Sequence, residues 1–408
     1  MNVGIVTTWF ERGASYVSRQ FEKTLSEKYN IFIYARGGEK YAIGDPNWDK
    51  NNVTWGERNF LSTPTYVNIS DFRKWIINNS IDLIIFNEQL EWKPIIACNQ
   101  LNVLTGAYID YYKKDTVSLF GAYDFLICNT KRHHSVFKWH PQCFYVPWGT
   151  DTDVYLPKSI NKNKNDKLFF FHSCGMNPKR KGTGLLLEAF KKVDRLNSKL
   201  IIHTQVDLQS FVPSNWNFIN KCVNEGSLQI IKETVAAPGL YHLGDVYVYP
   251  SILDGIGLTI LEAISCGLPS IVTNQQPMNE FIKNDDAGKL INVAYEQQRG
   301  DSYFWPESIS NTNSIAFHMN YYIENRKNIN DLKAKARNYA LKHLDWNKNS
   351  IKLNEIIKNV KKIKSLEKDR ALENARHYDN KLFIVNILNN SRMTIKIKKK
   401  LKKIIWNF

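Results

Sequence analysis

Short strand-like runs alternate with amphipathic helical patterns along most of the chain, and no other feature restricts its fold as strongly. Val3–Thr8 is a run without charged residues, and Ser15–Lys28 follows it with apolar residues at helical spacing. Strands without polar alternation are typical of parallel sheets that helices cover on both faces. Right-handed crossovers between such strands give a doubly wound topology. The sequence therefore predicts an α/β protein with doubly wound parallel sheets.

The strand–helix pattern begins a second time after the lysine- and asparagine-rich stretch Lys158–Asp166. This stretch has the composition of a linker, and 408 residues are enough for two domains. We therefore predict one domain over residues 1–157 and another over 158–345. The expected strands are Val3–Thr8, Ile31–Ala35, Asp82–Phe86, Val103–Ile109, Asp124–Cys128 and Cys143–Pro147, then Leu168–His172, Lys199–Thr204, Asp245–Tyr249, Ser270–Thr273 and Lys289–Val293.

Neither a secretion signal nor a disulfide framework is expected. The N-terminal sequence MNVGIVTTWFERG lacks a basic region followed by a long apolar one. No stretch approaches the roughly 18 apolar residues that span a bilayer. The six cysteines are scattered, without a C-x-x-C pair that would suggest zinc. We therefore expect a soluble, cytoplasmic protein with no metal site.

The positive charge is concentrated at the carboxyl end of the chain. The whole sequence has 55 Lys and Arg against 39 Asp and Glu, and residues 361–408 hold 14 and 4 of these. A nucleic-acid-binding protein should instead carry a basic stripe with interleaved aromatics on a recognisable module. That function is therefore the least favoured of those considered, and no nucleic-acid partner is expected.

The most informative segment is Asp245–Thr273, DVYVYPSILDGIGLTILEAISCGLPSIVT, which reads as strand, loop, helix and strand. Gly255 and Gly257 fall just after the strand, where the next helix begins. Backbone N–H groups and the positive end of the helix dipole favour an anionic ligand there. Gly267 stands where a left-handed helix cap is expected.

Two carboxylates flank this glycine turn. Asp254 lies in the loop, and Glu262 lies eight residues later within the helix. Their spacing alone leaves two alternatives open. They are binding residues of a phosphate-binding enzyme, or Asp254 is a helix cap and Glu262 a hydrogen-bonded helix residue.

The segment D-GIGL-TILEA-ISCGLP resembles the signature of the family-four retaining glycosyltransferases, which have the GT-B fold. PWGTDTDVYLP, GMNPKRKGTGLLLEAF, HLGDVYVYPS and the region of Trp346 resemble further family segments in the same order. The resemblance covers roughly residues 1–360. It implies two Rossmann-like domains that face a central cleft, with residues 346–370 returning as a helix to the first domain.

The resemblance also implies a nucleotide diphosphate sugar as donor, with retention at the anomeric carbon. Asp254 would face the donor sugar, Glu262 would bind the ribose, and the glycine turn would hold the distal phosphate. Arg180 and Lys181 would supply the positive charge that the diphosphate needs, so neither a metal nor another cofactor is expected. The implied donor-binding residues are Gly13, Arg180, Lys181, Gly255, Gly257, Leu258, Thr259, Glu262 and Glu280.

Three positions depart from the family pattern. Asp254 replaces the usual glutamate, and Met176 replaces an arginine of the second-domain loop. The usual first-domain histidine has no match, and Asp110 stands at or next to its position. We treat Asp110 as a second catalytic candidate, with a strand-end cap as the alternative. These departures keep open a non-catalytic sugar-nucleotide-binding protein.

The acceptor is expected to be a glycan or a lipid-linked sugar, with Trp9, Trp92, Tyr111 and Tyr112 as candidates for stacking on sugar rings. Residues 371–408 are predicted to form a basic amphipathic tail that ends in RMTIKIKKKLKKIIWNF. A cationic amphipathic helix suits the headgroup layer of an anionic bilayer. We therefore expect peripheral attachment to the inner face of the cell membrane. His133 and His134 are predicted to lie at the surface.

Overall fold

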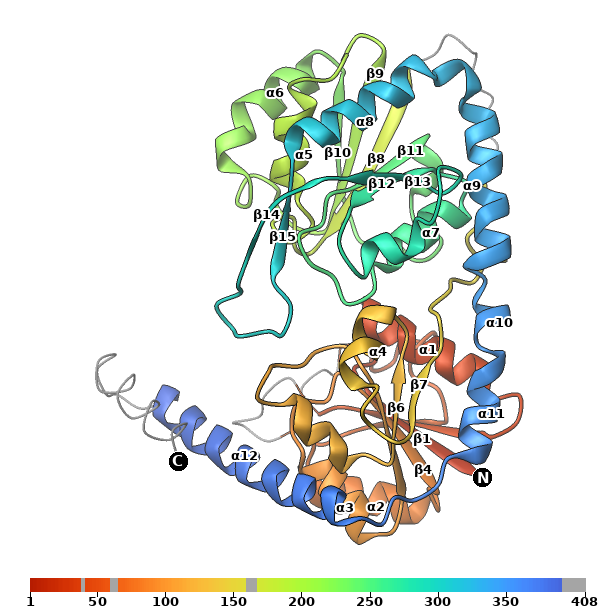
Figure 1. Ribbon diagram of the computed structural model, residues 1–408, viewed down its shortest axis with the longest axis vertical. Coiled ribbons are helices and arrows are strands. Elements are labelled where there is room, and N and C mark those ends of the chain that lie inside the picture. Colours follow the sequence, from red (N-terminus) through yellow and green to blue (C-terminus); the bar gives the residue numbers. More distant parts are fainter. Residues whose placement is uncertain (38–40, 59–64, 159–166, 391–408) are drawn as a thin grey trace. The chain divides into compact units, whose positions relative to one another are not determined.

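The computed structural model describes residues 1–37, 41–58, 65–158 and 167–390 (Figure 1). The chain forms two compact units. Unit 1 consists of Met1–Cys128, His133–Tyr145 and the chain from Leu353 onward, and unit 2 consists of Asn129–Arg132 and Val146–Lys352.

Unit 1 is built on a seven-stranded sheet with the order β3-β2-β1-β4-β5-β6-β7, in which all neighbours are parallel. Five of its strands had been predicted, to within one or two residues, as apolar runs, and β7 is shorter than predicted because it stops at Tyr145. The strands are β1 (Asn2–Thr7), β2 (Asn30–Ala35), β3 (Val53–Trp55), β4 (Leu83–Asn87), β5 (Leu104–Tyr108), β6 (Phe125–Cys128) and β7 (Cys143–Tyr145). The connecting helices are α1 (Gly13–Leu25), α2 (Ile69–Asn78), α3 (Lys93–Gln100), η1 (Val117–Ala122) and α4 (Lys131–Phe137).

Unit 2 is built on a six-stranded parallel sheet with the order β10-β9-β8-β11-β12-β13. Its strands are β8 (Leu168–Gly175), β9 (Ser198–Thr204), β10 (Leu228–Lys232), β11 (Val246–Tyr249), β12 (Ser270–Thr273) and β13 (Gly288–Ile291). A separate antiparallel hairpin consists of β14 (Val293–Gln297) and β15 (Glu307–Ser310). The helical elements are α5 (Thr183–Phe190), η2 (Pro213–Asn215), α6 (Trp216–Asn224), η3 (Tyr241–Leu243), α7 (Leu258–Ser265), η4 (Met278–Phe281), α8 (Thr312–Glu324), η5 (Arg326–Asn328), α9 (Ile329–His343) and α10 (Trp346–Asn349).

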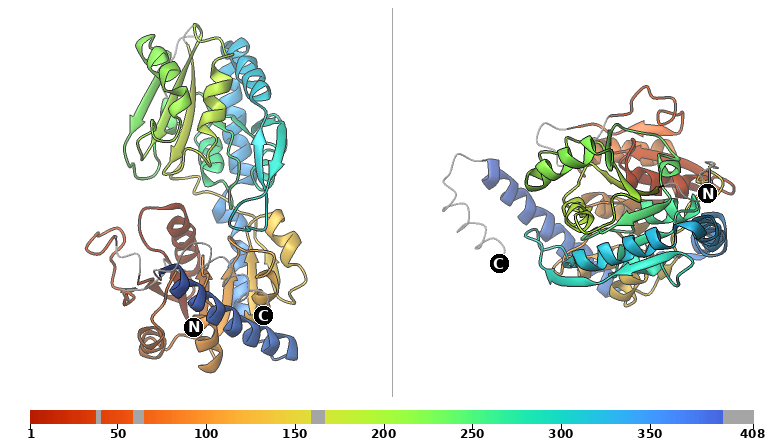
Figure 2. Two further views of the ribbon diagram at one scale, coloured as in Figure 1. Left: turned by 90° about the vertical axis from the view of Figure 1, so that its left-hand side faces the viewer. Right: turned by 90° about the horizontal axis from the view of Figure 1, so that it is seen from above.

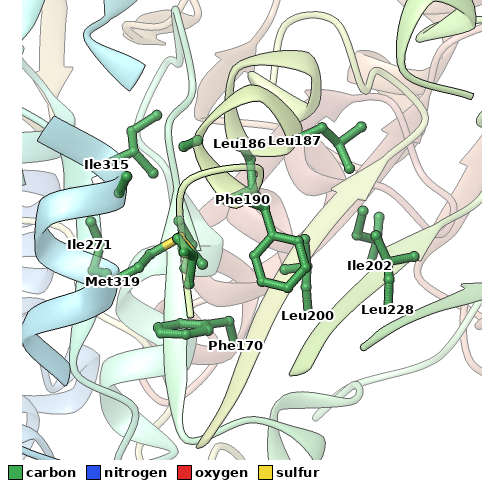
Figure 3. Packing of buried hydrophobic residues seen from close by; sticks show 14 of the residues in the cluster. Phe170, Leu186, Leu187, Phe190, Leu200, Ile202, Leu228, Ile271, Ile315 and Met319 are labelled. Carbon is green, nitrogen blue, oxygen red and sulfur yellow. The ribbon is translucent and has the colours of Figure 1, made fainter. Parts of the chain in front are cut away.

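The core of unit 2 lies between its sheet and the helices α5 and α8. Figure 3 shows Phe190 of α5 directed at the strand that carries Leu200, and Met319 of α8 lying near Ile271. These side chains are fully buried. Burying one side chain of this size contributes roughly 1.5–3 kcal/mol to folding. The packed layer therefore holds the sheet in place, and the loops at the strand ends project from it.

The division into units differs from the predicted boundary between residues 157 and 158. Val146–Pro157 belongs to unit 2 rather than to the first domain. Thr150 explains this placement, since its N–H donates to Leu344 O (2.7 Å) and its carbonyl accepts from Trp346 N–H (2.9 Å).

Residues 353–390 pack within unit 1 through α11 (Ile351–Asn359) and α12 (Leu366–Asn390). Figure 2 shows α12 in dark blue, lying across unit 1. Asp379 accepts hydrogen bonds from the N–H groups of Trp92 and Lys93 at 2.9 and 2.8 Å, and buried Lys368 pairs with Asp124.

The part of the predicted tail before residue 391 is therefore a docked helix, because its polar side chains find partners on unit 1. The strongly basic sequence RMTIKIKKKLKKIIWNF falls outside the described residues. In the described part of the chain, no helix is both long enough and apolar enough to cross a bilayer.

The α/β class and the two doubly wound sheets are confirmed, whereas the surface position predicted for His133 is wrong. His133 is buried, and its Nδ1 lies 2.9 Å from the hydroxyl of Tyr112. Tyr112 is itself buried, as are Trp9 and Trp92. These three aromatics therefore serve as core residues of unit 1.

Candidate active site

The predicted glycine turn connects β11 to α7 in unit 2. Gly257 has a φ of +94° and precedes α7 as its N-cap, a conformation that L side chains rarely adopt. Leu258 and Thr259 form the first turn of α7, and the N–H of Gly255 donates to Asp254 Oδ1 at 3.1 Å. Gly267 follows the helix with a φ of +81°, as the sequence predicted.

A second loop, between β8 and α5, lies directly against this turn. Gly182 has a φ of +72°, and a Cβ there would come within 2.0 Å of Pro250 O. Arg180 O accepts hydrogen bonds from Ile252 N–H (2.9 Å) and Ser251 Oγ (3.1 Å). The absence of a side chain at Gly182 thus lets the β8–α5 loop pack on the β11–α7 loop.

The sheet order explains why these two loops meet. In the order β10-β9-β8-β11-β12-β13, the chain winds outward in one direction from β8 and in the other from β11. The connections after these two neighbouring strands therefore diverge. In doubly wound folds this switch point is where ligands bind, at the carboxyl ends of the strands.

Both predicted cations converge on one carboxylate at this point. Lys181 Nζ lies 2.6 Å from Asp254 Oδ2, and Arg180 Nη1 lies 3.2 Å from the same oxygen. Arg180 Nη1 also donates to Leu253 O at 3.0 Å. Met176, which stands at the position of the family arginine, is exposed and takes no part in this cluster.

Tyr249 completes the cluster, although no sequence motif predicts its role. Its hydroxyl donates to Asp254 Oδ2, and Lys181 Nζ contacts both that hydroxyl and the ring, 4.7 Å from the ring centroid. Tyr249 is fully buried at the last position of β11. A tyrosine directly before the proline that ends a buried strand is the only local signal that could have identified it.

The electrostatics of the cluster follow from burial and from these contacts. Burial opposes ionisation of Asp254, but the cations of Lys181 and Arg180 outweigh it and hold the pKa of the carboxyl group well below its usual range. Burial lowers the pKa of Lys181 to about 8, although Asp254 partly counters this effect. Near pH 7 the cluster is therefore a carboxylate between two cations, with a net positive charge.

Glu262 lies farther along α7 and faces η3. The hydroxyl of Tyr241 donates to Glu262 Oε2 at 2.5 Å, and burial raises the pKa of Glu262. One carboxylate oxygen is thus oriented by a buried tyrosine. Tyr241 and Glu262 are 21 residues apart, and no local pattern marks Tyr241 as the partner.

The remaining predicted residues lie on other elements. Gly13 begins α1 and Asp110 follows β5 by two residues, so both belong to unit 1. Glu280 lies in η4 of unit 2, and its carboxylate accepts hydrogen bonds from the N–H groups of Lys131 and Arg132 at 2.6 and 2.9 Å. Glu280 therefore binds the start of α4.

His172 bonds Val248 O and Thr183 Oγ1, which satisfies both of its ring nitrogens within the core. Across the described ranges, no three His, Cys, Asp or Glu side chains are grouped so that they could hold a metal ion. The positive charge beside Asp254 comes from side chains.

Parts of this chain are similar in sequence to known proteins. Residues 156–299 match the model of the family described as glycosyl transferases group 1. A probable sucrose-phosphate synthase of Thermosipho melanesiensis is 26% identical over 38% of this chain and 37% of its own. An Escherichia coli UDP-Gal:alpha-D-GlcNAc-diphosphoundecaprenol alpha-1,3-galactosyltransferase is 45% identical over 14% of each chain. The matched segments thus span well under half the length of these curated relatives.

The likeness to solved structures extends over both units. The Anabaena protein HepE in complex with UDP-glucose has a TM-score of 0.67 at 14% identity, over 88% of this chain and 100% of that one. A glycosyltransferase from Rickettsia africae has a TM-score of 0.68 at 15% identity, over 88% and 99%. These likenesses show that the chain has the GT-B fold, and its match to the family of glycosyl transferases group 1 lies within residues 156–299.

Proposed function

We propose that the protein transfers a sugar from a nucleotide diphosphate sugar to a glycan or lipid-linked acceptor, with retention at the anomeric carbon. One observation carries the proposal. A half-buried carboxylate, Asp254, is held ionised by Lys181 and Arg180 directly beside the glycine turn that begins α7. The two cations attract a diphosphate, and the glycine turn lets it come close to the backbone N–H groups. The carboxylate can then contact the donor sugar.

The diphosphate would bind at the glycine turn and draw on the charge of Lys181. The cluster carries two cations and one carboxylate, so it attracts an anion even while Asp254 is paired. Because side chains supply this charge, we expect transfer to continue in the presence of a metal chelator.

Glu262 would accept hydrogen bonds from the ribose hydroxyls of the donor. Tyr241 and Tyr155 both hydrogen-bond the Glu262 side chain, so the carboxylate is held in one orientation toward the sugar. A hydrogen bond between a hydroxyl and a carboxylate is charge-assisted and contributes about 1.5–3 kcal/mol.

Asp254 would contact the donor sugar and stabilise positive charge as the anomeric bond breaks. Donor binding would shift Lys181 from the carboxylate toward the phosphates. Attack from the face of the departing phosphate would give retention, and support for this step comes from the resemblance of D-GIGL-TILEA to the family-four motif.

The acceptor class is inferred from a relative and from the end of the chain. The matched Escherichia coli protein is named for a diphosphoundecaprenol acceptor. The basic sequence RMTIKIKKKLKKIIWNF suits an anionic membrane surface, where such an acceptor would be found. We therefore place the protein in the cytoplasm, attached to the inner face of the membrane.

The test is incubation of the full-length protein with labelled nucleotide sugars and a membrane extract, with EDTA present in a parallel set. We expect transfer or donor hydrolysis with at least one donor, and loss of both in the double variant Arg180→Ala, Lys181→Ala. Donor binding without any turnover would favour the alternative, a non-catalytic sugar-nucleotide-binding protein. Neither binding nor turnover with any donor would contradict both functions.

A further inference from the structure

Unit 2 contains a hollow with a volume of about 560 Å³. Its walls are the β8–α5 loop with the start of α5, the segment Phe211–Asn215, and the hairpin β14–β15. Asp254 and Glu262 do not belong to the described residues that line this hollow. Arg180 lines it and also contacts Asp254, so the hollow adjoins the candidate active site.

Two aromatic side chains stand at this hollow with much of their surface exposed. Phe211 is 40% exposed and Tyr295 of β14 is 57% exposed. Aromatic rings combined with a few oriented polar groups are typical of small-molecule sites. A pyranose ring presents an apolar C–H face that stacks on such rings and hydroxyls that bind polar groups.

The polar side chains of the hollow are held in fixed positions. Gln297 Nε2 donates to Glu307 Oε2 at 2.9 Å across the hairpin. Asn215 Nδ2 donates to Glu188 Oε1 at 2.6 Å on the opposite wall. Each pair retains further donor and acceptor capacity, which matches the vicinal hydroxyl groups of a sugar.

Among the charged groups of the lining, the Glu307 carboxylate bonds the amide of Gln297 and can bind sugar hydroxyls, while one cation is open to an acidic group. Arg299 pairs with Asp301 at 2.7 Å, and Lys191 neutralises Glu188 at 2.7 Å. Lys179, in contrast, has no ion-pair partner within the part of the chain that the structure describes, and it is exposed at the edge of the hollow. A ligand that carries one acidic substituent would supply that partner.

We propose that this hollow is a subsite for an acidic sugar residue of the glycan acceptor, stacked on Tyr295 with its acidic group on Lys179. The proposal rests on the proposed function, since the occupant is part of the acceptor. The acidic group is either a carboxylate, as in a uronic acid, or a phosphate ester. The β14–β15 hairpin, which stands outside the parallel sheet, would thus contribute to acceptor specificity.

Saturation-transfer NMR on the full-length protein tests this subsite without depending on catalysis. The probes are glucuronic acid, glucose 6-phosphate and glucose, and inorganic phosphate is added as a competitor because it has no carbon-bound proton to detect. The variants are Lys179→Ala and Tyr295→Ala, with Lys221→Ala as a matched control, since Lys221 is an exposed lysine of α6 outside the hollow. Nucleoside diphosphate binding is titrated separately for every variant.

We expect at least one acidic sugar to bind about tenfold more tightly than glucose. Lys179→Ala should remove that advantage, Tyr295→Ala should weaken every sugar, and Lys221→Ala should change nothing. The relative response to glucuronic acid and glucose 6-phosphate identifies the acidic group.

Absence of binding by both acidic sugars, or unchanged binding in both hollow variants, would overturn the subsite. Inorganic phosphate that binds as tightly as the sugars would overturn it too, because the site would then recognise an anion alone. If acidic sugars bind as expected but no nucleoside diphosphate does, the subsite stands and the proposed donor site fails.

Discussion

Lys181 and Asp254 lie 73 residues apart in sequence, and their side chains form an ion pair with a separation of 2.6 Å. One follows β8 and the other follows β11, the neighbouring strands at which the winding of the sheet reverses. The pair is therefore a product of the doubly wound topology, which brings the two loops together at the usual ligand position of such folds. Its charge state should control donor binding.

Donor affinity should fall as the pH rises through about 8. Burial lowers the pKa of Lys181 to about 8, so the ammonium that attracts the diphosphate is lost above that value. We expect the affinity for the donor's nucleoside diphosphate to fall about tenfold between pH 7 and pH 9, measured by calorimetric titration. Lys181→Arg keeps its charge over this range and should show little pH dependence. A flat wild-type profile, or an equal decline in the arginine variant, would exclude Lys181 as the titrating group.

Asp254→Asn should lower turnover much more than donor affinity. The amide still accepts hydrogen bonds from Lys181 and Tyr249, but it cannot stabilise positive charge at the anomeric carbon. Losing such an electrostatic contribution typically costs about 100-fold or more in rate. Asp254→Glu restores the residue usual in the family and serves as the conservative control. Wild-type turnover in the asparagine variant would mean that Asp254 serves only as a cap.

Asp379→Asn should stabilise the protein at pH 8 more than at pH 5. Burial raises the pKa of Asp379 to about 7, although the N–H groups of Trp92 and Lys93 oppose this. The carboxyl group of Asp379 thus binds its proton more tightly in the folded chain than in the unfolded chain. The stability that Asp379 contributes is present at low pH and is lost as the pH rises through about 7.

Asparagine accepts the same two backbone hydrogen bonds without a buried charge. We expect the gain in unfolding free energy to grow by about 1–3 kcal/mol between pH 5 and pH 8, measured by denaturant titration. A gain that is the same at both pH values would show that Asp379 does not titrate in this range.

Removal of residues 391–408 should weaken attachment to anionic vesicles. This segment holds seven Lys and Arg and no acidic residue, and each basic side chain near an anionic surface contributes about 1 kcal/mol. In flotation assays the full-length protein should bind anionic vesicles and should dissociate from them when salt is added. It should not bind neutral vesicles. The version ending at Asn390 should remain unbound. Equal binding by both versions would assign the membrane contact to another part of the chain.

The sequence predicted the strands that are buried on both faces. Phe170 of β8 and Val248 of β11 belong to such runs, since every side chain of a central parallel strand meets a helix layer. It missed β10, an edge strand whose Gln229 is exposed, and β3, which has only three residues. It also missed β14 and β15, because the hairpin is polar and lies outside the parallel sheet.

The candidate site was predictable only where one short segment carries the signal. The glycine turn with Asp254 and Glu262 is such a segment, and the loop with Arg180 and Lys181 is another. Tyr249 and Tyr241 act through contacts between separate elements, which no local pattern reveals. His133 was predicted at the surface because the helix sequence around it is polar. It is in fact buried and forms a hydrogen bond with Tyr112.

Calorimetric titration of the wild type and of Glu262→Gln with nucleoside diphosphates is the most direct test of donor binding beside α7. At least one of UDP, GDP, ADP, CDP and dTDP should bind the wild type. Glu262→Gln should weaken that binding by about tenfold or more, because a charge-assisted hydrogen bond to the ribose is lost. Glu225→Gln, at an exposed carboxylate of the same unit, should leave the affinity unchanged. Binding of none of the five, or equal affinity in wild type and Glu262→Gln, would contradict the assignment of this site to a nucleotide-sugar donor.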